Sequence, residues 1–101
     1  MLADPLGPIE LWALSTSSED VAIRNRVYLK LGASRGRQML AASFPGGSAR
    51  NEIRRRVLSK SESGESRGAM ISEVINEIVR EIVEASKLAQ KEESASRIKI
   101  N

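Results

Sequence analysis

Four arginines near the middle of this 101-residue chain are its best-placed residues for binding a charged ligand. Arg54, Arg55 and Arg56 are consecutive, and Arg50 precedes them by about one helical turn. On a helix these side chains would cover more than half of the circumference and could neutralise several phosphates. Because the same segment offers only Asn51 to read base edges, the pattern does not favour sequence-specific DNA recognition. Solvent or an acidic protein surface is the alternative neighbour of the arginines.

A small anion site is a second possibility, at Gly46-Gly47-Ser48 directly before these arginines. Free backbone N–H groups at the start of a helix attract anions such as phosphate. The segment lacks the lysine and the length of a phosphate-binding loop. A helix break at the glycines followed by an N-cap at Ser48 is therefore the simpler interpretation.

Residue types that perform catalysis are scarce. The chain has no His and no Cys, which excludes a Ser-His triad, a thiolate nucleophile and the usual zinc ligands. The acids between Glu73 and Glu84 flank an apolar stripe and do not converge, so they favour a solvated helix face over a metal site. No base stands in a recognisable relation to a hydroxyl or amine nucleophile. We therefore expect no enzymatic activity, no cofactor and no metal.

The charge of the chain is distributed unevenly. In total, 16 Lys and Arg residues and 13 Asp and Glu residues give a net charge of +3. Residues 24–60 hold ten of the basic residues and a single acid, Glu52. Such a block suits an anionic partner, whether nucleic acid, a lipid surface or an acidic protein. The first residues do not resemble a signal peptide and no apolar run approaches the ~20 residues of a membrane helix, so a cytoplasmic location without a membrane span is expected.

Breakers and capping residues predict a mainly α fold. Residues 9–14 are apolar and bounded by breakers, which indicates a short N-terminal strand. Its backbone groups would need a partner, and the chain offers only one other weak strand candidate, residues 97–100. The capping-box spacing from Thr16 to Glu19 predicts a first short helix that begins near Ser17. That helix should end at Gly32.

Two more short helices are expected before a linker. The first covers about 34–43, and the second runs from Ser48 to about Leu58. Residues 1–58 would then form a strand plus a helical domain. Residues 59–68, rich in Ser, Gly and charge, read as a flexible linker.

The clearest helix in the sequence follows the linker, over residues 69–91. Isoleucine and alanine recur on one face at spacings of three and four, as in a long amphipathic helix. Residues 92–101 are expected to fray. The apolar stripe must face either the preceding helices or another chain, and we expect it to be mainly intramolecular core. The residues considered for docking in the alternative case are Leu11, Trp12, Leu14, Ile71, Ile75, Ile78 and Ile82.

A resemblance to a known family rests on residues 12–53. It includes Trp12-Ala13-Leu14-Ser15-Thr16, then Glu19-Asp20-Val21-Ala22 with Arg24-Asn25-Arg26, and finally Phe44-Pro45-Gly46-Gly47-Ser48-Ala49. This pattern is similar to the C-terminal end of the large ATPases of type IV secretion systems, in the Dot/Icm and IncI-like conjugation branch. In that family a last strand beyond the nucleotide-binding core leads into a capped helix, which would explain an unpartnered strand here.

The resemblance implies a protein without the family's chemistry. The chain has no Gly-x-x-x-x-Gly-Lys-Ser/Thr loop and no strand that ends in an acidic metal ligand, so no catalytic residue is carried over. It implies a non-catalytic protein–protein interaction module, the C-terminal part or a partner of such an ATPase. The alternative is a small basic nucleic-acid-binding protein that uses the arginine-rich helix, and self-association is a third possibility.

Overall fold

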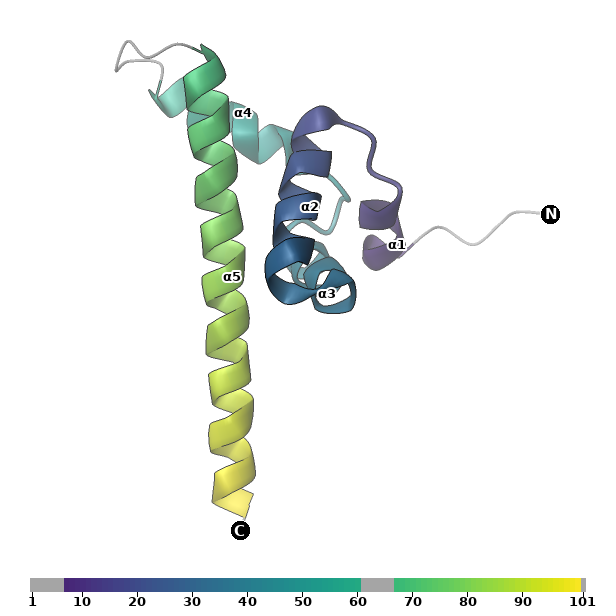
Figure 1. Cartoon of the computed structure of the whole chain (residues 1–101), viewed down its shortest axis with the longest axis vertical. Helices are drawn as coiled ribbons and strands as arrows, with labels where there is room; N and C mark the ends of the chain where they lie inside the picture. The colour runs from purple at the N-terminus through teal and green to yellow at the C-terminus, as the bar shows by residue number, and fades with distance from the viewer. Residues whose placement is uncertain (1–6, 61–66, 101) are drawn as a thin grey trace, which may run out of the picture.

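Five helices make up the part of the chain that the computed structural model describes, residues 7–60 and 67–100 (Figure 1). No β-strand occurs within these residues, so the fold is mainly α. The helices are α1 (Pro8–Ala13), α2 (Ser18–Leu31), α3 (Ala33–Ser43), α4 (Arg50–Lys60) and α5 (Arg67–Ile100).

The long helix α5 is the axis on which the other helices are arranged. Helices α2, α3 and α4 pack against it, and α1 packs on the far side of α3 (Figure 1). At a rise of about 1.5 Å per residue, its 34 residues span about 51 Å, close to the longest dimension of the molecule, 55 Å. The C-terminal part of α5 extends beyond the other helices.

The expected N-terminal strand over residues 9–14 is wrong, because this segment lies in α1 and its C-cap. Pro8 stands in the first turn, where its fixed φ suits a helix and its missing N–H breaks no helical hydrogen bond. The N–H of Leu11 donates to the Gly7 carbonyl at 3.0 Å. A helix satisfies its backbone groups within the segment, whereas a lone strand could not.

Helix α2 lies almost where its capping residues predict. Its N-cap is Ser17, one residue after the expected Thr16, and the N–H of Asp20 donates to the Ser17 hydroxyl at 3.1 Å. The partner three residues after the cap is therefore Asp20 instead of Glu19. Gly32 ends the helix with a φ of 86°, a conformation that favours glycine.

The next two expected short helices correspond to α3 and α4. Helix α4 reaches Lys60, so the first two residues of the expected 59–68 linker are helical. The last two, Arg67 and Gly68, belong to α5, and residues 61–66 lie outside the described residues.

The segment 92–101, expected to fray, continues as part of α5 as far as Ile100. Residue 101 lies outside the described residues. The sequence contains no Gly or Pro between Ala69 and Ile100. Since these are the residues that most strongly oppose a helix interior, nothing in this stretch enforces an earlier stop.

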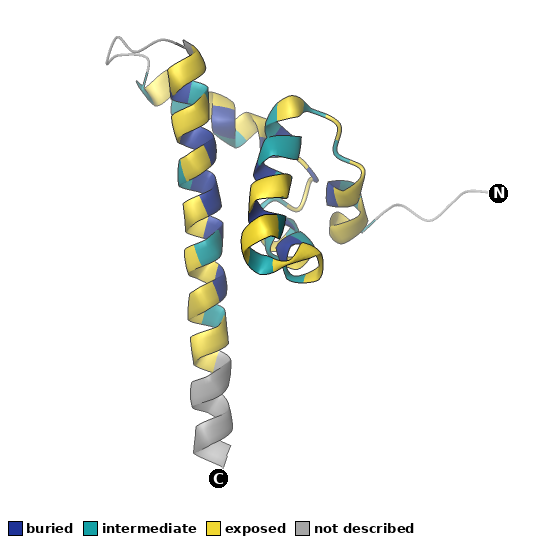
Figure 2. Cartoon of the chain, viewed as in Figure 1, coloured by how far each residue is buried: buried dark blue, intermediate teal, exposed yellow. Residues whose placement is uncertain are grey.

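The hydrophobic core lies where the apolar face of α5 meets α2, α3 and α4 (Figure 2). Most of its volume is aliphatic, and each fully buried aliphatic side chain contributes roughly 1.5–3 kcal/mol. The largest fully buried hydrophobic side chains are those of Trp12, Ile23, Leu40, Ile78, Val27 and Val74.

Candidate functional site

The glycine turn before α4 holds an anion that belongs to the chain itself, the carboxylate of Asp20. This side chain is 3% exposed. Its Oδ1 accepts from the backbone N–H of Ala49 at 2.8 Å, and its Oδ2 accepts from the Ser48 hydroxyl at 3.0 Å and from the Ser17 hydroxyl. Asp20 thereby joins the start of α2 to the start of α4. The possible anion site at Gly46-Gly47-Ser48 is thus filled from within.

Ser48, the expected N-cap, lies one residue before the N-cap position, because α4 begins at Arg50 and the Ala49 carbonyl accepts from the N–H of Ile53. Its hydroxyl still accepts from the N–H of Arg50 at 3.2 Å. The neighbouring Gly47 has a φ of 78°, and a Cβ there would lie 2.6 Å from the Cβ of Leu11. The turn therefore requires glycine for its backbone conformation and for the close approach of α1.

The N-terminal docking candidates divide between core and surface. The Trp12 side chain is fully buried, its Nε1–H donates to the Phe44 carbonyl at 3.0 Å, and its ring lies 6.0 Å from the Phe44 ring. Leu11 is partly buried, and Leu14 is 61% exposed. Trp12 therefore ties α1 to the end of α3, and only Leu14 of the three is well exposed.

The docking candidates on α5 are used within the chain. Ile75, Ile78 and Ile82 are 7% exposed or less and belong to the hydrophobic core. Ile71 is partly buried and packs against the same core. The stripe is therefore intramolecular core, and these four side chains offer no continuous surface to another chain in this structure.

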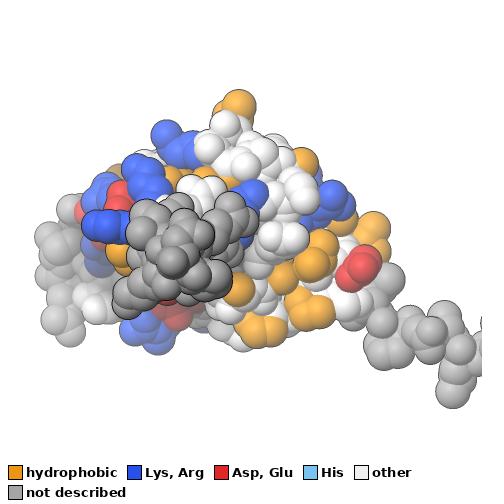
Figure 3. Space-filling model, turned by 90° about the horizontal axis from the view of Figure 1, so that it is seen from below, with side chains coloured by type: hydrophobic (Ala, Val, Ile, Leu, Met, Phe, Trp, Pro, Cys, Tyr) orange, Lys and Arg blue, Asp and Glu red, His pale blue; other side chains and the backbone are white. Residues whose placement is uncertain are grey.

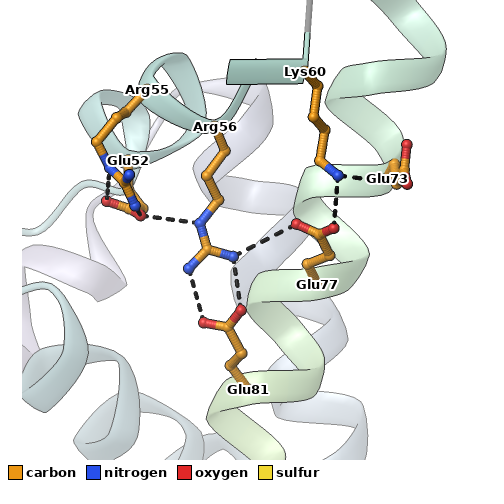
Figure 4. A network of polar contacts seen from close by, with 7 residues as sticks. All are labelled: Glu52, Arg55, Arg56, Lys60, Glu73, Glu77 and Glu81. Carbon is orange, nitrogen blue, oxygen red and sulfur yellow. Dashed lines mark hydrogen bonds and ion pairs between the residues drawn. The ribbon is translucent and has the colours of Figure 1, made fainter. Parts of the chain in front are cut away.

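Two of the four arginines of helix α4 form ion pairs with acidic side chains of the chain (Figure 4). Both terminal nitrogens of Arg56 donate to the two carboxylate oxygens of Glu81 at 2.8 Å. Its Nε donates to Glu52 Oε1 at 2.9 Å, and Glu77 lies 3.7 Å from Nη1. Arg56 thus binds α4 to α5 through a two-point contact, the arrangement in which arginine–carboxylate pairs are strongest.

A lysine extends this network by one turn. The Nζ of Lys60 lies 2.9 Å from Glu77 and 3.6 Å from Glu73. The acids of α5 that were expected to form a solvated face therefore include three, Glu73, Glu77 and Glu81, that pair with cations of α4.

Hydrogen bonds in this network shift several pKa values. Those from Arg55, and then Arg56, lower the pKa of Glu52 from 4.5 to about 2. The hydrogen bond from Arg56 lowers the pKa of Glu81, and the one to Glu77 raises the pKa of Lys60. All three shifts favour the charged forms and so keep the network ionised.

The four candidate anion-binding arginines are consequently not equivalent. Arg56 faces α5 and Arg55 pairs with Glu52. Arg50 and Arg54 are exposed, and their side chains make no hydrogen bond or ion pair with the side chains described, those of residues 7–60 and 68–92. Only these two stay fully available to an external anion.

An open groove between α2 and α5, not foreseen from the sequence, has a volume of about 580 Å³. Leu29 is 87% exposed at its rim. Its residues are Arg26, Leu29 and Lys30 of α2 with Asn76, Val79, Arg80, Val83, Glu84 and Lys87 of α5. The basic residues of the groove come from two helices far apart in sequence, Arg26 and Lys30 from α2 and Arg80 and Lys87 from α5. Only the packing of α2 on α5 brings them together.

The described residues contain no group of three or more His, Cys, Asp or Glu that could hold a metal ion. In the same part of the chain, no helix has both the length and the apolar composition that a membrane span requires. Comparison of the sequence and structure with protein-family models, curated proteins and solved structures found no match.

Proposed function

We propose that this chain is a non-catalytic protein-interaction module that docks through the α2–α5 groove. Its partner presents an amphipathic helix with acidic flanks. The observation that carries the proposal is the exposure of Leu29, which is 87% accessible beside Val83 and the buried Val79. A leucine at the rim of a concave surface with an apolar floor is the arrangement that receives an amphipathic helix.

The charges around the groove select the partner. Arg26, Lys30, Arg80 and Lys87 line it, whereas Glu84 is the only acid among its residues. Lys87 lies 3.7 Å from Glu84, and the Arg26 guanidinium donates to Asn76. Figure 3 shows several Lys and Arg side chains exposed on one face of the molecule, with acidic side chains among them. Complementary charge would steer an acidic segment to this surface and fix its orientation.

For the identity of the partner we propose an ATPase of a type IV secretion or conjugation system, or a component next to it. The support is the residue pattern over 12–53. The helical state of residues 9–14 removes one argument for this relationship, since no unpartnered strand needs a missing sheet. The proposal therefore depends on the pattern and on the groove.

Nucleic-acid binding through the arginine-rich helix is the weaker proposal. Two of its four arginines are already paired with carboxylates of the chain. With Arg50 and Arg54 alone, about two phosphates would be neutralised, and the logarithm of affinity would fall with the logarithm of salt concentration with a slope of only about −2.

Matched surface variants test the docking proposal against purified secretion ATPase. Leu29→Ser should abolish co-purification without lowering the free energy of unfolding, because the side chain is almost fully exposed. Leu14→Ser, which alters a comparable exposed leucine outside the groove, should leave co-purification unchanged. Loss with Leu14→Ser and retention with Leu29→Ser would instead place the docking surface at α1. Absence of binding by the unaltered chain would refute the ATPase as partner.

A further inference from the structure

We propose that the cleft between α4 and the start of α5 binds an alkyl carboxylate, a ligand with an unbranched apolar chain and a single carboxylate at one end. Helix α4 packs against the N-terminal part of α5 (Figure 1). The cleft has a volume of about 400 Å³, which lies within the size range of small-ligand sites. Its described lining residues divide into an aliphatic wall and three charged side chains.

The aliphatic wall combines buried and exposed side chains. Ile53 and Met70 are 5% and 6% exposed, and Val57 and Ile71 are partly buried. Leu58 also lines the cleft and is 65% exposed. Covering exposed apolar surface with an apolar ligand lowers the free energy roughly in proportion to the covered area. The wall therefore favours a ligand with an apolar body.

The charged residues favour a ligand with one negative charge. Arg50 and Arg54 of α4 are about one helical turn apart, and both are exposed. Their side chains make no hydrogen bond or ion pair with the side chains that the structure describes. Glu19 of α2 is the one acid among the described lining residues, and its carboxylate accepts from the Ser18 hydroxyl at 3.2 Å. Two cations and one acid leave an excess of one positive charge, which a single carboxylate balances.

An alkyl chain fits the wall better than a peptide does. Apart from the three charged residues, no side chain that lines the cleft in the described structure is a strong hydrogen-bond donor or acceptor. The amide groups of a bound peptide would lose their water without gaining a side-chain partner, which costs affinity. An alkyl chain has no such groups, and its carboxylate end reaches the arginines at the exposed side.

This site is separate from the docking groove. The residues that line the cleft and those that line the α2–α5 groove do not overlap. The proposal also does not depend on a protein partner, so the two proposals can fail independently.

Titration of the ¹⁵N-labelled chain with decanoate, kept below the concentration at which it forms micelles, tests the site by NMR. We expect saturable shifts at the backbone amides of Ile53, Arg54 and Ile71. In the series hexanoate, octanoate and decanoate, each added methylene should tighten binding by roughly two- to fourfold. Shifts that do not saturate, or equal affinities across the series, would overturn the proposal.

A charge variant tests the carboxylate end of the ligand. Arg54→Gln should weaken decanoate binding by roughly two- to fivefold, the range of an exposed ion pair. The affinity for decanol, which has the same chain without the charge, should stay unchanged in this variant. Arg80→Gln removes the same charge outside the cleft and should leave both affinities unchanged. An equal effect of the two variants on decanoate would contradict the role of the cleft.

An apolar variant tests the chain of the ligand independently. Leu58→Ser should weaken the binding of both decanoate and decanol, because it removes part of the wall. Leu88→Ser alters a leucine of similar exposure, 61%, outside the cleft, and it should change neither affinity. Decanoate affinity that survives Leu58→Ser would overturn the assignment. Tighter binding of a short peptide with a C-terminal leucine and free carboxylate than of decanoate would replace the alkyl carboxylate with a peptide and so refute the proposal.

Discussion

At the scale of single residues, the buried Asp20 side chain joins the starts of two helices. Its carboxylate accepts hydrogen bonds from Ser17, Ser48 and the N–H of Ala49, so one side chain organises the starts of two helices. The sequence places it in the first turn of α2, where an acid is expected for its favourable interaction with the helix dipole. Its contact with a turn 29 residues later depends on tertiary packing, which local patterns cannot predict.

Replacement of Asp20 should therefore destabilise the fold beyond the effect of a lost surface charge. Asp20→Ala leaves the buried N–H of Ala49 without its acceptor and removes one hydrogen bond from the more exposed Ser48 hydroxyl. We expect a loss of about 2–4 kcal/mol in the free energy of unfolding, measured by urea denaturation. Glu19→Ala, a change at the neighbouring and more exposed acid, is the control and should cost less than about 1 kcal/mol. Equal effects of the two changes would contradict the role given to Asp20.

At the scale of elements, ion pairs decide how α4 meets α5. Arg56 and Lys60 of α4 engage Glu77 and Glu81 of α5, and Arg56 also holds Glu52 of its own helix. The sequence shows a cationic helix and an acidic helix face, and each alone suggests an external partner or solvent. Their pairing was missed because their relative placement depends on how the chain returns after residue 60.

Helices α2 and α1 show where sequence patterns succeed and where they fail. Ser17 and Gly32 bound α2 because caps act locally. Residues 9–14 were misassigned because a short apolar run fits both a strand and a buried helix. Pro8 before Glu10 was the local signal for a helix start.

Acid should weaken the ion pairs of Glu52 within α4 in a predictable pH range. The pKa of Glu52 is about 2 in the folded chain and 4.5 as its ordinary value. Its contribution is therefore fully present above about pH 5 and is lost as the pH falls toward 2. The solvent-screened contribution amounts to about 1 kcal/mol.

The measurement is urea denaturation of the unaltered chain and of Glu52→Gln across this pH range. On acidification, the free energy of unfolding of Glu52→Gln should fall by about 1 kcal/mol less than that of the unaltered chain. Glu84→Gln removes an exposed acid whose nearest cation is 3.7 Å away, and it should keep the slope of the unaltered chain. Identical slopes in all three proteins would show that the Glu52 ion pairs do not stabilise the fold.

At the scale of the whole molecule, the core is complete within the chain and the sites for partners lie at its surface. The residues expected to dock, Trp12 and the isoleucines of α5, hold α1 to α3 and α5 to the other helices. The groove was not predicted, because it combines residues from helices that lie far apart in the sequence. The basic block from 24 to 60 supplies only Arg26 and Lys30 of the groove, and Arg80 and Lys87 come from α5.

The docking proposal is tested most directly by mapping a bound helix onto the molecule. The probe is a synthetic amphipathic helix with leucines on one face and glutamates beside them, added to the ¹⁵N-labelled chain and followed by NMR. We predict saturable amide shifts along the groove, at Leu29 and Lys30 of α2 and at Val83 of α5, that disappear in Leu29→Ser. A peptide with lysines in place of the glutamates should not bind. Shifts centred on α1, or equal binding of the two peptides, would contradict an acidic partner in the α2–α5 groove.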